Sequence, residues 1–203
     1  MNDEFLTTEA LETLRDKIFA GLEKLGVVID RTGERAVANS FETAALLPHV
    51  NLMEIIGAFL AEEFREGSFY AVVGIGEDPT SGTVLAQWTA RRLSELTRSE
   101  VLALRGCRKD LGIGLTINGV PRTELRGKRV VVVTDVLATG ATVGQLVDKL
   151  RRELHATVVG VAAIGVREDV ATTIPRAVRV HTLLGIKGRD CLKLRDGDKK
   201  GQK

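Results

Sequence analysis

A short run of acidic, hydroxylated and glycine residues in the middle of the chain has the composition of an anion-binding loop. Residues 134–142 read TDVLATGAT. Thr139 and Thr142 supply hydroxyl donors, and Gly140 lets the backbone approach a ligand closely. Asp135 is negative and cannot bind a phosphate, but its carboxylate can accept hydrogen bonds from sugar hydroxyls beside one. Phosphate in the loop and ribose at the acid would form a ribose-5-phosphate site.

The segments on either side of this loop predict a strand and a helix. Val130 to Val133 form a β-branched run without polar alternation, which is typical of a strand buried on both faces, and we expect it to end at Thr134 and Asp135. Apolar residues then recur at helical spacing: Val143, Leu146, Val147, Leu150 and Leu154. The first amides of a helix lack internal partners, and the helix dipole favours an anion there. An ordinary strand-to-helix turn is the alternative, but it would not need this acid and these hydroxyls.

The loop resembles the diphosphate-sugar motif of type I phosphoribosyltransferases, which usually has two acidic residues, two apolar ones and a Thr-Gly-Gly-Thr-like loop. The resemblance implies binding of 5-phosphoribosyl-1-diphosphate (PRPP). Thr134 stands where the first acid usually is, and Ala141 stands where a second glycine is common. The loss of one carboxylate predicts weaker or different recognition of the ribose hydroxyls. The residues implied for ribose-5-phosphate binding are Thr134, Asp135, Ala138, Thr139, Gly140, Ala141 and Thr142.

Size and composition restrict the classes of protein that the chain can represent. Its 203 residues, 44% hydrophobic and 28% charged, suit one good-sized globular domain. A net charge of +2 does not point to nucleic acid or an anionic membrane, and no stretch has the length of a membrane span. Two cysteines form neither a disulfide framework nor a metal-site spacing. The start of the chain is acidic and does not resemble a signal peptide, so we expect a cytoplasmic protein.

The first third of the chain predicts two helices with strand-like pieces between them. Thr8 to Leu25 is amphipathic, a turn follows at Gly33, and Pro48 opens the second helix. In orotate phosphoribosyltransferases a similar opening forms a small hood over the base, and this segment resembles it. We expect a helix and hood-like segment, a phosphoribosyltransferase core and a charged, disordered tail, at residues 1–66, 67–193 and 194–203 respectively.

A glycine-rich loop follows the first predicted core strand, Phe69 to Ile75. It lacks the lysine of a Walker loop, because Thr83 stands in that place, and its third glycine comes too late for a dinucleotide fingerprint. The resemblance implies that this loop holds the diphosphate. Its two carboxylates would repel a diphosphate unless Mg²⁺ lies between them. The residues implied for this loop are Gly76, Glu77, Asp78, Ser81 and Gly82.

A long segment after the predicted strand Val101 to Leu104 carries basic residues, and long loops in compact domains are often functional. Orotate phosphoribosyltransferases have a mobile catalytic loop here, so the resemblance implies that Arg108 and Lys109 neutralise the leaving diphosphate. The later lysine and histidine of that loop fall on Gly112 and Gly114. A solvated basic turn is the alternative.

Turn chemistry within the same segment suggests further structure. We expect Leu115 to Ile117 to pair with Val120 in a hairpin whose turn is Asn118-Gly119.

Strands and helices alternate from Phe69 onward, which predicts a mostly parallel sheet with helices on both faces, the fold of type I phosphoribosyltransferases. Two further strands are expected, at Thr157 to Ile164 and Val178 to Leu184. Arg167 follows the first of them at the carboxyl end, where α/β proteins bind ligands, and the resemblance makes it a candidate for contacting the base. A salt bridge to a neighbouring acid is the alternative for Arg167.

Three functions follow from the resemblance. The first is an enzyme that transfers ribose-5-phosphate from PRPP to a base, most simply orotate. Its catalytic residues would be Arg108, Lys109 and Asp135, and Mg²⁺ would bridge the diphosphate and the ribose. The second is a catalytically reduced protein of the same fold that binds PRPP or a nucleotide. The third is a purine phosphoribosyltransferase. No protein ligand for the metal stands out, a homodimer is expected from the family, and a DNA-binding repressor is disfavoured because one helix alone precedes the hood.

Overall fold

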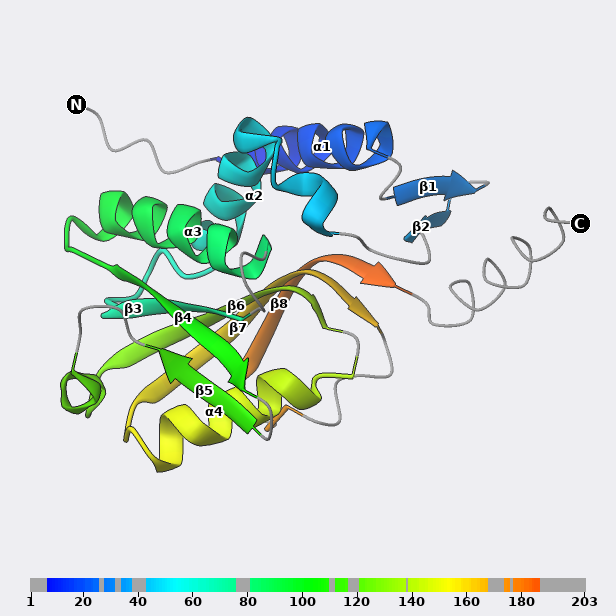
Figure 1. The fold of residues 1–203 in the computed structure, drawn as a ribbon. Coiled ribbons are helices and arrows are strands. Elements are labelled where there is room, and N and C mark those ends of the chain that lie inside the picture. Colours follow the sequence, from blue (N-terminus) through cyan, green and yellow to red (C-terminus); the bar gives the residue numbers. More distant parts are fainter. Residues whose placement is uncertain are drawn as a thin grey trace, which may run out of the picture.

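The computed structural model describes residues 7–25, 28–31, 34–37, 43–75, 81–109, 112–116, 121–137, 139–167, 174–175 and 177–186 (Figure 1). Its elements, in chain order, are α1 (Thr8–Lys24), β1 (Val28–Arg31), β2 (Glu34–Val37), the 3₁₀ turn η1 (Thr43–Leu46), α2 (Val50–Glu62), β3 (Ala71–Ile75), α3 (Ser81–Thr97), β4 (Leu102–Lys109), β5 (Gly112–Thr116), the 3₁₀ turn η2 (Arg122–Leu125), β6 (Arg129–Leu137), α4 (Ala141–Arg152), β7 (Thr157–Arg167) and β8 (Arg179–Ile186). The tail from residue 194 lies outside the described residues.

The core is a six-stranded sheet of order β5-β4-β3-β6-β7-β8. Every neighbouring pair is parallel except β4 and β5, which are antiparallel. The expected mostly parallel sheet is therefore confirmed, with one antiparallel strand at its edge. Strand β6 lies between β3 and β7, so the segment that leads into the acidic loop is central to the sheet.

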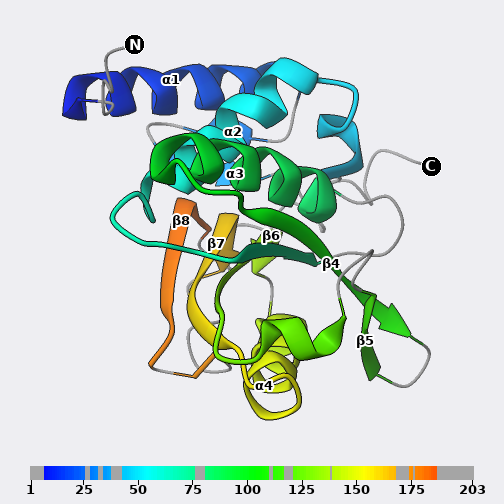
Figure 2. The ribbon, with the colours of Figure 1, turned by 90° about the vertical axis from the view of Figure 1, so that its left-hand side faces the viewer.

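Helices cover both faces of this sheet, as Figures 1 and 2 show. Helices α2 and α3 lie on one face with α1 packed outside α2, and α4 lies on the other face. The valine run serves both layers. Val131 and Val133 pack with the α1, α2 and α3 side chains, whereas Val130 and Val132 pack with α4. All four are fully buried, which is why the run shows no polar alternation.

The N-terminal elements follow the predicted pattern of helix, short strands and helix. Thr7 caps α1 by accepting a hydrogen bond from the amide of Ala10 at 3.2 Å. Strands β1 and β2 pair antiparallel in a separate two-stranded sheet, with Arg31 opposite Glu34. Helix α2 crosses α3 closely at Gly57, where a side chain would overlap the Cβ atom of Trp88. The turn at Gly33 lies outside the described residues.

One expectation about strand boundaries was wrong. Strand β6 does not end at Thr134 and Asp135 but continues to Leu137, which pairs with Val166 of β7. A hairpin that the sequence did not predict joins β4 and β5, with Lys109 opposite Gly112, and the hairpin expected within residues 115–120 stays a prediction. The observed hairpin needs a connection of two residues, so its ends meet with little loss of chain entropy. Residues 117–120 lie outside the described residues.

Candidate functional site

The topology brings the predicted loops to one end of the sheet. Strands β4, β3, β6 and β7 are adjacent and parallel, so their carboxyl ends lie at the same edge. These strands end at Lys109, Ile75, Leu137 and Arg167. Ligands of α/β proteins bind outside the carboxyl ends of parallel strands. The basic segment, the glycine-rich loop, the acidic loop and the candidate base contact therefore border one region.

The N-terminus of α4 has the geometry of an anion-binding helix start. Gly140 is its N-cap residue, with φ 65° and ψ −4°, a left-handed conformation that a residue without Cβ adopts at little cost. The Gly140 carbonyl accepts from the Gly144 amide at 2.7 Å, and the Thr139 hydroxyl accepts from the Ala141 amide at 3.4 Å. Thr139 and Ala141 are exposed and Thr142 is half-buried, so solvent reaches this turn. Ala138 lies outside the described residues.

The carboxylate of Asp135 is held in place by its two sequence neighbours. Its Oδ1 accepts a hydrogen bond from the Val136 amide at 2.7 Å and another from the Thr134 hydroxyl at 3.2 Å. Asp135 is half-buried and Thr134 is 4% exposed. Hydrogen bonds from buried donors fix the orientation of a carboxylate. The sequence assigned Thr134 to the ribose, and its role in orienting Asp135 was not foreseen.

The glycine-rich loop is bounded by a close contact between β3 and α3. A side chain at Gly82 would overlap the carbonyl oxygen of Ile75, and one at Gly74 would overlap the carbonyl oxygen of Gly82. Gly82 is buried in the first turn of α3, so packing alone requires a glycine there. Three other residues assigned to this loop, Gly76, Glu77 and Asp78, lie outside the described residues. The backbone of Ser81 is described, but its side chain is not.

The basic candidates lie on strands rather than in a free loop. Arg108 pairs with Ile113 in the hairpin of β4 and β5, and Lys109 is the last residue of β4. Arg167 ends β7 and pairs with Ile186 of β8. The backbone therefore places all three at the carboxyl end of the sheet, whereas their side chains lie outside the described part of the structure.

The donors at this end suit a magnesium ion that arrives with a diphosphate. Across the described residues there is no group of three or more His, Cys, Asp or Glu that could hold a metal ion by itself. Mg²⁺ is commonly bound through one or two carboxylates and the phosphates of a substrate, and keeps several waters. Asp135, a carboxylate two residues before the end of β6 and close in sequence to the exposed start of α4, fits this second mode. None of the helices in the described ranges is both long and apolar enough to cross a membrane.

Comparisons with known proteins agree with this architecture. An orotate phosphoribosyltransferase of Pelotomaculum thermopropionicum is 26% identical over 176 residues, covering 84% of both proteins. A phosphoribosyltransferase structure from Corynebacterium diphtheriae superposes with a TM-score of 0.62 at 24% identity, covering 90% of this chain and 99% of that one. The structure of the Mycobacterium tuberculosis orotate phosphoribosyltransferase in complex with PRPP superposes with a TM-score of 0.59 at 19% identity. The match covers 85% of this chain and 89% of that one.

At these identities the two structures show a shared fold, that of type I phosphoribosyltransferases. The sequence model of the phosphoribosyl transferase domain matches residues 42–180, from just before η1 to the start of β8. The matched range contains the acidic loop and all four strand ends that border the site. The chain belongs to the phosphoribosyltransferase family.

Proposed function

We propose that this protein transfers ribose-5-phosphate from PRPP to a nucleobase, most simply orotate, and releases diphosphate. The observation that carries the proposal is the pairing of Asp135, oriented by hydrogen bonds, with the left-handed Gly140 at the start of α4. One feature suits a pentose and the other a phosphate monoester. The relative named as an orotate phosphoribosyltransferase, matched over 84% of both chains, supports orotate as the first base to test.

The proposed reaction needs positioning and charge stabilisation more than covalent chemistry. The bond between ribose C1 and diphosphate breaks, a base nitrogen bonds to C1, and that nitrogen loses its proton to solvent. The amides and hydroxyls of residues 139–142 would hold the 5-phosphate. Asp135 would accept hydrogen bonds from the ribose hydroxyls and stabilise the positive charge that develops on the ring. Bound Mg²⁺ would neutralise charge on the diphosphate.

The remaining site residues act on the two ends of the reaction. Arg108 and Lys109 would neutralise the diphosphate as it leaves, and Arg167 would contact the base. All three roles rest on backbone position at the carboxyl end of β4 and β7. The diphosphate loop, Gly76 to Gly82, would hold the diphosphate, with Mg²⁺ between its carboxylates and the ligand.

Two substitutions separate binding from turnover. Asp135→Asn keeps the shape of the side chain but removes its charge, so we expect it to weaken PRPP binding more than Arg108→Ala does. Arg108→Ala should lower turnover more. PRPP affinity by calorimetry and diphosphate release with orotate measure the two effects. Equal losses in both assays from both variants would contradict the assigned roles.

A second function, binding of PRPP or a nucleotide without turnover, is favoured by Thr134 in place of an acid and by Gly112 and Gly114 in the hairpin. Under both functions PRPP with Mg²⁺ should raise the melting temperature. A ligand at about 100 times its Kd adds about 2.7 kcal/mol, or roughly 5–10 °C for a chain of this size. Diphosphate release with orotate supports the enzyme, and release only with adenine, guanine or hypoxanthine supports a purine enzyme. Absence of release with any of these bases or uracil supports the binding protein.

A homodimer remains a prediction drawn from the family. Sedimentation or gel filtration of the purified chain tests it directly.

A further inference from the structure

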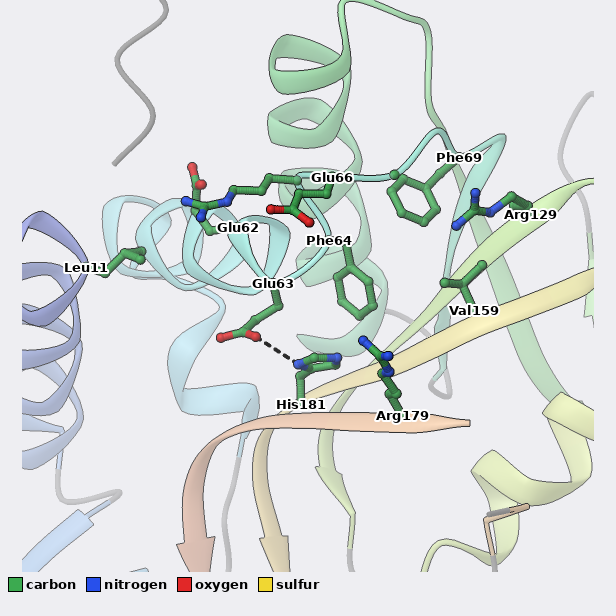
Figure 3. Close-up of a pocket in the computed structure, with 12 residues that line it drawn as sticks. Leu11, Glu62, Glu63, Phe64, Glu66, Phe69, Arg129, Val159, Arg179 and His181 are labelled. Carbon is green, nitrogen blue, oxygen red and sulfur yellow. Dashed lines mark hydrogen bonds and ion pairs between the residues drawn. The ribbon is translucent and has the colours of Figure 1, made fainter. Parts of the chain in front are cut away.

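A cavity of about 660 Å³ lies at the opposite end of the sheet from the candidate site. It is bordered by the end of α2, the turn into β3, and the first residues of β6, β7 and β8 (Figure 3). Arg129 begins β6 and Asp135 follows six residues later, so the two ends are about 20 Å apart along the strand. The cavity therefore does not belong to the PRPP site.

Two arginines frame this cavity from strands that flank β7. Arg129 is opposite Thr157, and Arg179 is opposite Gly160. Two strand spacings separate β6 from β8, and Arg179 is level with Val131, two residues beyond Arg129, so the backbones of the two arginines are about 12 Å apart. The side chains of Arg129 and Val131 point to the same face of the sheet, because they are two residues apart on one strand, and the same holds for Arg179 and Leu183. Val131 and Leu183 both pack on the α2 side. Both guanidinium groups therefore extend over the same face of the sheet.

Aromatic packing fixes the wall between these arginines. The ring of Phe64 meets Phe69 edge to face at 6.0 Å and His181 at 5.0 Å. The guanidinium of Arg129 lies over the Phe69 ring, 5.4 Å from its centre. In Figure 3, Phe64 lies between Phe69 and His181, with Arg129 beside the former and Arg179 beside the latter. The wall is held by side chains that are largely buried, so the cavity is a built feature.

The charges that line the cavity leave an excess of cations. Glu62 pairs with Arg92 at 2.8 Å, which offsets its charge, whereas Glu63 lies 2.8 Å from His181, a side chain that carries a charge only when protonated. Within the described ranges no acidic side chain pairs with the other three cations, which are Arg65, Arg129 and Arg179. Glu66 is the remaining carboxylate of the lining. Three arginines against two carboxylates, Glu63 and Glu66, leave a net positive charge that favours an anionic ligand.

We propose that this cavity is a second binding site, which takes the phosphate group of a small phosphorylated molecule between Arg129 and Arg179. One guanidinium group can donate two parallel hydrogen bonds to two oxygens of a phosphate, and it stays positively charged at every physiological pH. The volume lies within the range of about 300–1,000 Å³ that is usual for small-molecule sites, enough for a nucleotide. The site does not depend on the proposed transferase activity, because it shares no residue with the carboxyl end.

The test observes both arginines directly. The side-chain Nε–H signals of Arg129 and Arg179 are followed by NMR as inorganic phosphate is added at constant ionic strength, with Arg129→Gln and Arg179→Gln assigning the two signals. We expect both signals to shift together and to saturate with a Kd of about 1 mM or below. In each variant, the phosphate Kd obtained from the signal of the remaining arginine should rise by roughly tenfold or more.

Two controls separate this site from its alternatives. Arg126→Gln removes the same charge from an exposed turn outside the cavity and should leave the titration unchanged. Ala141→Asp introduces a negative charge at the other phosphate site and should also leave it unchanged.

The identity of the ligand is tested with the same signals. Tighter binding of a ribonucleoside monophosphate than of inorganic phosphate identifies a phosphate ester, and equal binding identifies the free ion. Signals that do not shift, or that lose their response in Ala141→Asp, overturn the proposal.

Discussion

The neighbours of Asp135 decide where its carboxylate points, and one of them departs from the family pattern. Thr134 donates to Asp135 Oδ1 and is almost fully buried. Thr134→Val keeps the shape of the side chain but removes this donor. A hydrogen bond to a charged group contributes about 1.5–3 kcal/mol, so we expect PRPP affinity to fall roughly tenfold or more, as measured by calorimetry.

Thr134→Ser is the matched control, because it keeps the hydroxyl and loses only a methyl group. It should bind PRPP within a few-fold of the original protein. A loss in Thr134→Ser as large as that in Thr134→Val would mean that packing of the methyl group, and not the hydrogen bond, supports the site. In that case the hydrogen bond from the Val136 amide would matter more than that from Thr134 for the orientation of Asp135.

Tyr70 gives a second prediction at this scale, one that concerns stability and pH. Its hydroxyl donates to Glu124 Oε2 at 2.8 Å, and this bond, followed by burial and the negative charges of Glu124 and Glu100, raises the pKa of Tyr70 above 10. The folded state therefore favours the protonated phenol. The resulting stability is fully present below pH 10, the pKa of the unfolded chain, and is lost as pH rises through the higher pKa of the folded chain.

The measurement is the urea midpoint between about pH 9 and about pH 11. We expect Tyr70→Phe to show a smaller alkaline loss than the original protein, and Glu124→Gln to behave like Tyr70→Phe. A steeper loss in Tyr70→Phe would contradict the assignment, because the sign of the effect would be reversed.

At the scale of elements, the start of α3 is set by how closely it approaches β3. Gly82→Ala would place a methyl group against the Ile75 carbonyl oxygen, a backbone atom that cannot rotate away. Overpacking of this kind costs about 1–3 kcal/mol, which exceeds the gain of about 1 kcal/mol that alanine brings to a helix. We expect Gly82→Ala to lower the free energy of unfolding, measured by urea denaturation.

Gly21→Ala is the matched control in α1. Its added methyl group would lie 2.8 Å from the Cδ1 atom of Leu52, the end of a side chain that can move aside. This variant should be neutral or more stable. Equal destabilisation by both substitutions would mean that the contact between α3 and β3 is no tighter than the contact between α1 and α2.

The elements also show how far the sequence determined the fold and where it did not. The valine run predicted a strand buried on both faces, because no polar residue interrupts it, and β6 confirms this. Local patterns failed where tertiary pairing decided the outcome. The valine run was expected to end at Thr134 and Asp135, but β6 runs on past Asp135 because β7 extends beside it, and the pairing of residues 112–116 with β4 was not foreseen.

The candidate site was predictable to the same degree. The sequence predicted that Asp135, Thr139 and Gly140 would lie together between a strand and a helix, and the fold places them so, whereas their binding of ribose and phosphate stays a prediction. Gly82 was assigned to the ligand, whereas packing against Ile75 already requires it. The arginines at the amino end could not be grouped from the sequence, since Arg129 and Arg179 lie fifty residues apart and meet only through the strand order.

At the scale of the whole molecule, one sheet presents different chemistry at its two ends. The carboxyl end holds an acid and a helix start, and the amino end holds a cavity that Arg129 and Arg179 frame. The family match covers residues 42–180 and leaves α1, β1 and β2 outside it. The family model therefore matches the sheet and its loops, whereas α1 packs outside that range on α2, and β1 packs on α1.

The separation of the two ends predicts a localised response to ligand, measurable by hydrogen exchange. PRPP with Mg²⁺ should slow exchange of the amides at residues 139–143, because these groups would bind the phosphate directly. Amides that exchange only by global unfolding should slow throughout the sheet, by about a hundredfold at 100 times the Kd. Rapidly exchanging amides at residues 64–70, around the distant cavity, should not change. Protection there without protection at residues 139–143 would place PRPP at the amino end and refute the assignment of the carboxyl end.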